Sequence, residues 1–231
     1  VTAYALIRYR LYKKEFDFSV SLVEDFLFLM LACVILGGRI GYVLFYNLDY
    51  FISHPLQIVW PFVNGQYVGI AGMSFHGGLF ACLAAGVWFL KRKKIAILDF
   101  ADLVMPAAAL GYTFGRIGNF VNGELYGRAT DFVLAMNFQG ELRHPSQLYE
   151  AFFEGLVLFV ILFGLRKKSW LKNRQLFAFL GLYSFFRFMI EFVREPDAHL
   201  GLFYGLSMGQ ILSLATVLIC ITLLRSSRLR V

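Results

Sequence analysis

Gly115-Arg116-Ile117-Gly118-Asn119-Phe120-Val121-Asn122-Gly123-Glu124-Leu125-Tyr126-Gly127-Arg128 is the stretch that decides the fold of this 231-residue chain. It follows an apolar run, Leu98 to Phe114, without a break, so a guanidinium enters at the end of a membrane-length helix. A charge at membrane depth costs about 3 kcal/mol or more and persists where it has a partner or a function. Arginine offers a planar fork of donors suited to phosphate. A helix end with packing glycines and one snorkelling arginine would also explain the stretch.

The composition is that of a membrane protein. The chain is 59% hydrophobic and only 16% charged, where a soluble domain averages about 25% charged residues. Several apolar runs approach the ~20 residues that cross a bilayer as a helix. We therefore predict one all-α, polytopic membrane domain over residues 1–231, with no soluble module. The three cysteines lie in separate apolar runs and give no disulfide framework.

The hydropathy pattern predicts seven membrane-spanning helices. We expect the first to be truncated, because the chain starts at Val1 inside an apolar run. The expected ranges are 1–11, 22–46, 70–90, 98 into the opening motif, 146–165, 175–193 and 207–224.

The basic residues give the orientation. Of the 22 basic residues, 16 fall in the loops or tail after the first, third, fifth and seventh helices, and all the lysines are among them. Since cytoplasmic loops carry the excess of lysine and arginine, these segments are predicted to be cytoplasmic. The net charge of +7 is thereby explained by orientation, and we expect no nucleic-acid partner.

The remaining basic residues are all arginines: Arg39, Arg116, Arg128, Arg143, Arg187 and Arg194. A helical rise of about 1.5 Å per residue puts Arg39, Arg116 and Arg187 in the outer half of the hydrocarbon core. Glu154, Glu191 and His76 fall in the same half. These groups predict a cavity that opens to the outer leaflet and is lined by positive charge.

Three further patterns carry possible chemistry. His76 lies between glycines at a helix start, where it can exchange a proton near neutral pH or simply bond a backbone carbonyl. Tyr183, Arg187 and Glu191 are four residues apart and share a helix face, which suits a cavity-facing arginine oriented by Glu191 or a self-neutralising ion pair. In Arg143 to Glu150, Ser146 can cap a helix, and Arg143 and Glu150 are the residues that capping does not explain. No second ligand stands at metal spacing from His76, so we expect no metal.

Taken together, these residues resemble the bacterial prolipoprotein diacylglyceryl transferases. Gly115 to Glu124 matches the family signature Gly-Arg-x-Gly-Asn-Phe-x-Asn-x-Glu. The resemblance also covers four other blocks in order: 38–47, 73–78, 143–150 and 186–197. The family's seven-helix architecture agrees with the loop count.

The resemblance implies a reaction without a cofactor. The diacylglyceryl group of phosphatidylglycerol passes to the lipobox cysteine thiol in the signal peptide of a preprolipoprotein; a thioether forms and glycerol 1-phosphate leaves. Its implied catalytic residues are Arg116, Arg187, His76 and Tyr183. The implied substrate-binding residues are Arg116, Asn119, Glu124, Gly127, Arg39, Arg143, Glu191 and Arg194. The implied location is the bacterial inner (cytoplasmic) membrane, with the active site toward the outer leaflet and membrane lipid as a partner.

A transporter or flippase for an anionic lipid or solute is the alternative, because an arginine-lined cavity suits that function too. It predicts openings to both sides, whereas polar residues thin out toward the inner half, apart from Asp99 and Asp102. An intramembrane protease lacks a suitably placed serine–histidine or paired-aspartate arrangement.

Overall fold

A computed structural model describes residues 1–60, 62–63, 66–67, 72–195, 202–203 and 205–225. The chain forms two compact units. The first comprises Val1–Phe16 and Leu98–Val231, and the second comprises Asp17–Ile97. We call them unit 1 and unit 2 and describe each by itself.

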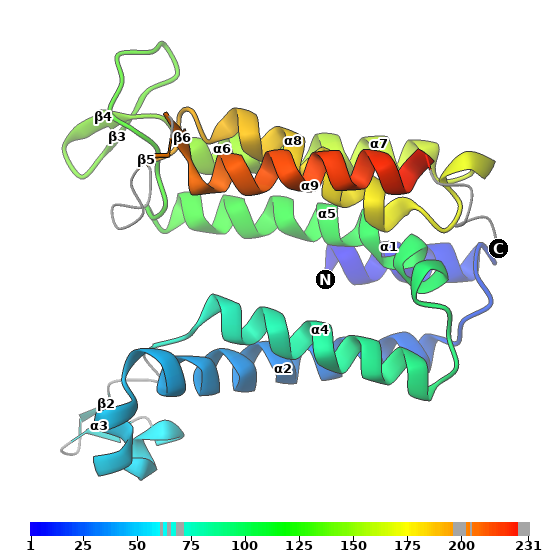
Figure 1. Cartoon of the computed structure of the whole chain (residues 1–231), viewed down its shortest axis with the longest axis horizontal. Helices are drawn as coiled ribbons and strands as arrows, with labels where there is room; N and C mark the ends of the chain where they lie inside the picture. Colours follow the sequence, from blue (N-terminus) through cyan, green and yellow to red (C-terminus); the bar gives the residue numbers. More distant parts are fainter. Residues whose placement is uncertain (61, 64–65, 68–71, 196–201, 204, 226–231) are drawn as a thin grey trace. The chain divides into compact units, whose positions relative to one another are not determined.

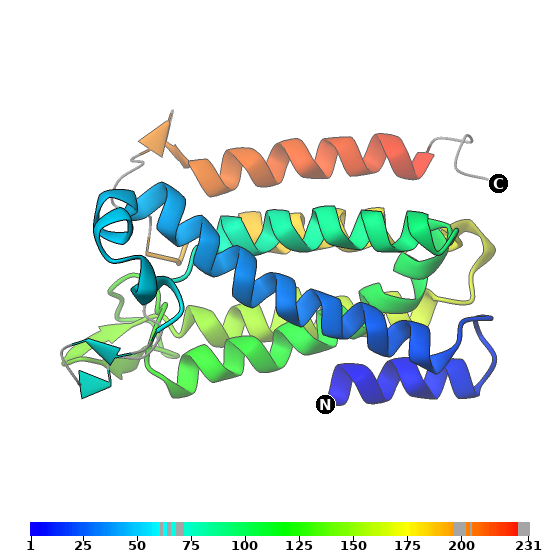
Figure 2. The same cartoon turned by 90° about the horizontal axis from the view of Figure 1, so that it is seen from below.

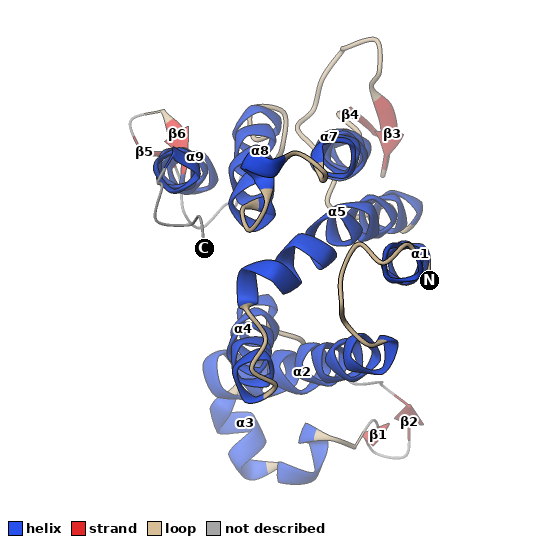
Figure 3. Cartoon of the chain, turned by 90° about the vertical axis from the view of Figure 1, so that its right-hand side faces the viewer, coloured by secondary structure: helices blue, strands red, loops and turns tan. Residues whose placement is uncertain are grey.

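Unit 2 is built on a helix pair, α2 (Val20–Tyr46) and α4 (Phe75–Arg92), which lie side by side (Figure 3). Ser19 and Ser74 cap these helices by accepting the backbone N–H groups of Leu22 and Gly77 at 3.1 and 3.2 Å. The chain segment that connects α2 to α4 contains three short elements. They are α3 (Leu48–Ser53), the 3₁₀ turn η1 (Pro55–Ile58) and a hairpin of β1 (Phe62–Val63) with β2 (Gln66–Tyr67).

Glycine sets the distance between α2 and α4. A Cβ at Gly37 would collide with Ala81, and a Cβ at Gly41 would lie 2.8 Å from the Cα of Gly77. A Cβ at Gly77 would in turn collide with the carbonyl of Gly37. The two backbones therefore touch, as small residues allow in membrane helix pairs.

Unit 1 contains the remaining helices. They are α1 (Thr2–Tyr12), α5 (Ile97–Val121), a continuous helix from Ser146 to Leu165, α8 (Gln175–Ile190) and α9 (Met208–Arg225). The continuous helix consists of α6 (Ser146–Glu150), a π-helical segment η2 (Ala151–Val157) and α7 (Leu158–Leu165). Figure 1 shows α5, α6, α8 and α9 running alongside one another. Leu103, Leu158 and Leu162 are fully buried in this unit.

Short elements connect these helices. The hairpin of β3 (Met136–Phe138) and β4 (Glu141–Arg143) stands beyond the end of α5 (Figures 1 and 2). A 3₁₀ turn η3 (Ser169–Leu171) joins α7 to α8, and β5 (Leu202–Phe203) pairs with β6 (Leu206–Ser207) before α9.

The predicted all-α class is confirmed. Among the residues that the structure describes, four helices are long and apolar enough to cross a membrane, namely α2, α5, Ser146–Leu165 and α9, and α8 is a shorter apolar helix. The count of seven spanning helices and the single domain stay predictions. Two helix ends differ from expectation. α4 begins at Phe75 after its Ser74 cap, while the expected start at residue 70 lies outside the described part of the chain, and α8 ends at Ile190 instead of residue 193.

The capping role expected for Ser146 is wrong. Pro145 occupies the N-cap position, and the Ser146 hydroxyl donates instead to the carbonyl of Leu125 at 3.1 Å. Next to it, the Gln147 amide donates to the carbonyl of Glu124 at 2.6 Å. The first turn of α6 therefore holds the second half of the Gly115–Arg128 stretch.

At the opposite end of unit 1, Glu15 joins three segments. Arg10, only 1% exposed, donates to Glu15 at 2.9 Å and to the carbonyls of Asp102 and Leu103 at 2.8 and 2.7 Å. Arg166, just after α7, pairs with the same carboxylate at 3.1 Å. Burial favours the neutral acid, but the hydrogen bonds from Arg10 and Arg166 outweigh it and lower the pKa of the Glu15 carboxyl.

Substituting Glu15→Gln is expected to lower the melting temperature of the detergent-solubilised protein at pH 7, because two buried or half-buried guanidinium groups lose their counter-ion. The pKa of Glu15 is depressed in the folded state, so its stabilisation is present above the unfolded value of about 4.3 and is lost as pH falls through the folded value. The gap between wild type and variant should therefore shrink on acidification. Asp17→Asn, at an exposed neighbour, is the control. A gap that stays constant down to pH ~3 would contradict this account.

Candidate functional site

Three arginines from different segments of unit 1 converge on one carboxylate. Arg116 Nε on α5 lies 2.7 Å from Glu150 Oε2 on α6. Arg187 Nη1 on α8 lies 3.6 Å from the same oxygen, and Arg194 Nε, four residues past the end of α8, lies 3.8 Å from Glu150 Oε1. Glu150 is the centre of the arrangement, which we call the Glu150 cluster; its members are Tyr112, Arg116, Glu150, Glu154, Arg187, Glu191 and Arg194.

The cluster is electrically layered. The side chains of Glu150 and Glu154 are fully buried, whereas those of Arg116, Arg187 and Arg194 keep 16–18% exposure. The carboxylates therefore lie behind the arginines. The cluster contains three carboxylates, Glu150, Glu154 and Glu191, beside its three arginines. The most exposed charged side chains among them are the cationic ones.

Arg187 keeps its donors available. Its guanidinium forms ion pairs with Glu150 and, at 3.2 Å, with Glu191 one turn further along α8. Neither contact has hydrogen-bond geometry, and within the described part of the chain Arg187 donates no hydrogen bond. Glu191 is fixed in turn by Ser207, whose hydroxyl donates to its Oε1 at 3.1 Å. The guanidinium is thus held by charge while its N–H groups remain free for an oxyanion.

Arg116 is oriented from two sides. Its Nε donates to the Tyr112 hydroxyl at 2.9 Å, and its Nη1 donates to Asn119 Oδ1 at 3.3 Å. The Asn119 amide donates to Glu124 Oε1 at 2.8 Å, so the motif residues form one chain of hydrogen bonds. Among the described residues, nothing accepts from Arg116 Nη2.

Tyr112 links the two buried carboxylates. Its hydroxyl donates to Glu154 and lies 3.3 Å from Glu150 Oε2. Its ring meets Tyr183 edge to face at 5.7 Å between centroids. This places Tyr183 beside the cluster, against the tyrosine that orients Arg116.

The π-helical segment begins at the residue after Glu150. π-segments are rare and occur frequently at functional sites. Here the segment contains Glu154 and Gly155, and a Cβ at Gly155 would lie 2.8 Å from the Cα of Thr113. The widened helix therefore meets the backbone of α5 directly, next to Tyr112, which brings both carboxylates against the hydroxyl.

Backbone pairing fixes Arg194. The N–H of Gly127 donates to the carbonyl of His144 at 2.8 Å, and the N–H of Arg128 donates to the carbonyl of Val193 at 2.9 Å. The Arg128 guanidinium donates to the carbonyl of Arg194 at 2.7 Å. A Cβ at Gly127 would collide with the carbonyl oxygen of Val193. Gly127 is therefore required for a close backbone approach that holds Arg194 against Glu150.

Arg143 is engaged outside the cluster. Its guanidinium donates to Glu141 at 2.6 Å, to Glu195 at 2.9 Å and to the carbonyl of Gly127 at 3.2 Å. Two of these contacts connect β4 to the loop at Gly127 and to the segment at Glu195. Arg143 thus supports the backbone around Gly127 instead of pairing with Glu150.

In unit 2, Arg39 binds the chain's own backbone. Its guanidinium donates to the carbonyls of Gln57, Ile58 and Gly72 at 2.6, 2.8 and 3.2 Å and stacks over the ring of Phe51. The side chain is 9% exposed. This arrangement favours a structural role, in which Arg39 gathers the segment between α2 and α4.

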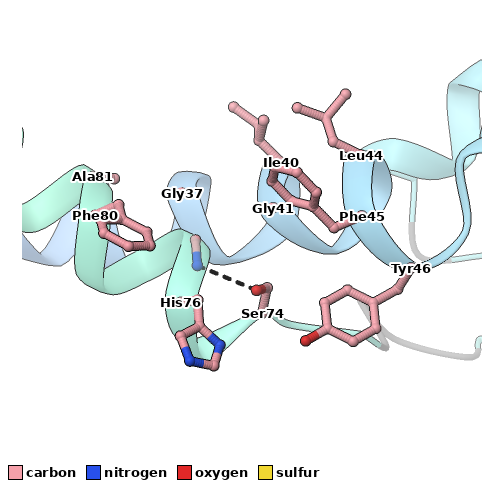
Figure 4. A pocket seen from close by; sticks show the side chains of 11 residues that line it. Gly37, Ile40, Gly41, Leu44, Phe45, Tyr46, Ser74, His76, Phe80 and Ala81 are labelled. Atoms are coloured by element: carbon pink, nitrogen blue, oxygen red, sulfur yellow. Dashed lines mark hydrogen bonds between the residues drawn. The ribbon is translucent and has the colours of Figure 1, made fainter.

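His76 occupies the second position of α4 and lines an apolar groove of about 750 Å³ between α2 and α4. Figure 4 shows its ring and the Tyr46 hydroxyl at the same edge of this groove. No hydrogen bond to the His76 ring occurs within the described residues, so the alternative of a carbonyl-bonded histidine is wrong there. The imidazole is available for a ligand.

The structure thus brings together Arg116, Asn119, Glu124, Tyr183, Arg187, Glu191 and Arg194 in one network. It gives Gly127 and Arg143 supporting contacts in the same unit, while Arg39 and His76 belong to unit 2. Sequence reasoning missed Tyr112 and did not place Glu150 in the site. The available signal was two carboxylates four residues apart in an apolar helix, and a tyrosine four residues before Arg116.

Comparison with known proteins identifies the family of the chain. The family model described as prolipoprotein diacylglyceryl transferase matches residues 1–225. Among curated relatives, the phosphatidylglycerol–prolipoprotein diacylglyceryl transferase of Geobacter sulfurreducens is 44% identical, over 96% of this chain and 85% of its own. Those of Chlorobaculum tepidum and Wolinella succinogenes are 48% and 45% identical, over 90% and 91% of this chain and 75% and 79% of theirs. This chain belongs to the prolipoprotein diacylglyceryl transferase family.

Proposed function

We propose that this protein transfers the diacylglyceryl group of phosphatidylglycerol to the lipobox cysteine of a preprolipoprotein. The carrying observation is the convergence of three partly exposed guanidinium groups on the buried Glu150. The thiolate sulfur attacks the carbon of the diacylglyceryl group that carries the phosphate ester oxygen. A C–S bond forms, the C–O bond breaks, and glycerol 1-phosphate leaves with the bonding electrons.

The leaving phosphate gains negative charge as its C–O bond breaks. Prepositioned guanidinium groups stabilise this developing charge more than they stabilise the phosphate diester of the ground state. Such a difference between transition state and ground state is what catalysis requires. We assign this role to Arg116 and Arg187. Tyr183 supports Tyr112, which orients Arg116, while Asn119, Glu124, Gly127, Glu191 and Arg194 hold the headgroup or the arginines.

The thiol proton needs an acceptor or a positive field, and we assign His76 as the acceptor because its ring is not bonded to the chain. The groove beside it, lined by Ile40, Leu44 and Phe80, suits an acyl chain. The basic-loop pattern supports an inner-membrane location with the Glu150 cluster toward the outer leaflet.

Purified protein incubated with acyl-labelled phosphatidylglycerol and a lipobox peptide tests the function directly. The peptide should gain the mass of one diacylglyceryl group on its cysteine. A peptide with serine in place of the cysteine is the control and should gain nothing. Redistribution of lipid between leaflets without any peptide modification would indicate the transporter alternative.

Arg116→Lys should reduce turnover severely although the charge is kept. The guanidinium contacts Glu150, Tyr112 and Asn119 at once and still has a free N–H, and one ammonium cannot reproduce that fork. Turnover is measured at saturating lipid, in protein with an unchanged melting temperature. Arg92→Lys, at the exposed end of α4, is the matched control. Near-normal turnover in Arg116→Lys would show that a point charge suffices.

Glu150→Gln should lower kcat by roughly 10²-fold, because the three arginines lose their common anchor and shift from the productive geometry. KM should not rise, because the cluster becomes more positive toward an anionic lipid. Glu154→Gln is the comparison variant: Glu154 is equally buried on the same helix and accepts from Tyr112, but it forms no ion pair with a described arginine, so a clearly smaller loss is expected. An equal loss in both variants, or a change in KM alone, would contradict the positioning role of Glu150.

His76→Asn should reduce turnover by roughly 10²–10⁴-fold if the imidazole takes the thiol proton. His54→Asn is the control, since His54 bonds the carbonyl of Tyr50 at 3.1 Å. Turnover within a few-fold of wild type would remove His76 from the chemistry and leave the arginines as the activators of the thiol.

A further inference from the structure

An exposed apolar surface lies in unit 2, on the segment that connects α2 to α4. Five large apolar side chains of α3, η1 and the two residues after η1 are exposed: Leu48, Ile52, Leu56, Val59 and Trp60. We call them the α3–η1 surface. Ile52 is 69% exposed and Leu56 is 78% exposed. Single exposed apolar residues are ordinary on proteins, but a group of this size in one short segment marks a site that another molecule covers.

α3 has three distinct sides. Phe51 faces the unit and is 5% exposed. Asp49 and Ser53 are one helical turn apart and share a polar side, where the Ser53 hydroxyl donates to the carbonyl of Asp49 at 3.2 Å. Leu48 and Ile52 have the same spacing and share the apolar side. A helix in the boundary between lipid and water has this distribution, because its apolar side meets acyl chains while its polar side stays in water.

The α3–η1 surface begins at the end of a membrane-length helix. α2 is long and apolar enough to span a bilayer, and its last residues, Leu44, Phe45 and Tyr46, are exposed apolar side chains. The lipid-facing surface therefore extends to the end of α2. Asn47 is the one residue between α2 and α3, so α3 starts at the bilayer surface. Seen along the helices, α3 projects to one side of the α2–α4 pair instead of prolonging α2 (Figure 3).

Arg39 holds the segment in this position. Its guanidinium, on α2, donates to the carbonyls of Gln57 and Ile58 in η1 at 2.6 and 2.8 Å, and its central carbon lies 4.9 Å from the ring centroid of Phe51 in α3. Both elements are thus tied to a residue about two turns before the end of α2. The segment therefore cannot extend away from the membrane surface into water.

The composition of the segment distinguishes lipid from other partners. No lysine or arginine occurs between residues 40 and 90, so the α3–η1 surface has no basic charge for an acidic protein or a nucleic acid. Tyr50 and Trp60 lie in the segment, and tyrosine and tryptophan are enriched at the level of the lipid headgroups. Continuity with the lipid-facing end of α2 indicates the same partner.

We infer that the α3–η1 surface is inserted in the bilayer boundary at the Tyr46 end of α2, with phospholipid as its partner. The apolar side chains reach about 5–10 Å into the boundary between headgroups and acyl chains. The connection between α2 and α4 is thus a monotopic membrane element and not an aqueous loop. This inference concerns the bilayer alone and holds whichever reaction the Glu150 cluster performs.

Trp60 provides a native probe of the α3–η1 surface. Replacing Trp88 and Trp170 by phenylalanine leaves it as the single tryptophan. This protein is placed in lipid nanodiscs, where buffer reaches both faces, and its fluorescence is measured with aqueous iodide and with phospholipids brominated either near the carbonyl end or near the tip of the acyl chains. We expect Trp60 to emit at a shorter wavelength than in the unfolded protein. It should lose most of its intensity to the near-carbonyl bromines, less to the chain-tip bromines and little to iodide.

Two neighbouring positions on α3 give a matched comparison. With all the native tryptophans replaced by phenylalanine, Ile52→Trp puts the probe on the apolar side and Ser53→Trp puts it on the polar side. We expect Ile52→Trp to be quenched as Trp60 is, and Ser53→Trp to be quenched mainly by iodide. Equal melting temperatures of the two proteins show that the difference comes from the side of the helix and not from a loss of folding.

The inference is overturned if iodide quenches Trp60 and Ile52→Trp as strongly as Ser53→Trp, because the segment would then be an aqueous loop. It is also overturned if Trp60 and Ile52→Trp are shielded from iodide and bromine alike, because protein would then cover the surface. Stronger quenching by the chain-tip bromines would contradict the boundary position, because the segment would lie deep in the hydrocarbon core.

Discussion

The fully buried Glu150 carboxylate is the constraint on which unit 1 depends. Arg116, Arg187 and Arg194 come from separate segments and all reach it. A buried charge is tolerated only with close partners, so the helices that carry these side chains cannot separate without exposing an unpaired ion. The same contacts direct the N–H groups of the arginines outward. Stability of the bundle and preorganisation for an oxyanion are thus consequences of one set of ion pairs.

Close backbone contacts make this arrangement possible. Gly155 lets the π-helical segment touch α5 at Thr113, and Gly127 lets the loop after α5 pair with the end of α8. A side chain at either position would push a charged segment away from Glu150. In unit 2, Gly37, Gly41 and Gly77 allow a comparable approach of α2 and α4. The glycines therefore contribute by determining where the charged residues stand.

The sequence predicted the helices well, because apolar runs of membrane length leave few alternatives. It also predicted that Arg187 and Glu191 meet, since residues four apart share a helix face. It did not predict the π-helical segment, which depends on packing against α5, or the central position of Glu150, which depends on three distant segments. Substrate binding by Arg39 stays a prediction; the backbone carbonyls to which it donates in the structure are supplied by the folded loop and could not be read from the sequence.

The central claim is that the arginines anchored by Glu150 bind the phosphate of the lipid donor. Solid-state NMR on protein with [¹⁵N]arginine, in bilayers containing phosphatidylglycerol but no acceptor peptide, measures this contact as dephasing between guanidinium ¹⁵N and lipid ³¹P. The account predicts a nitrogen–phosphorus distance of roughly 4 Å, as a charge-assisted hydrogen bond gives, and loss of that signal when Arg116 and Arg187 are both replaced by lysine. Absence of the short distance, or its persistence in the double variant, would contradict the account.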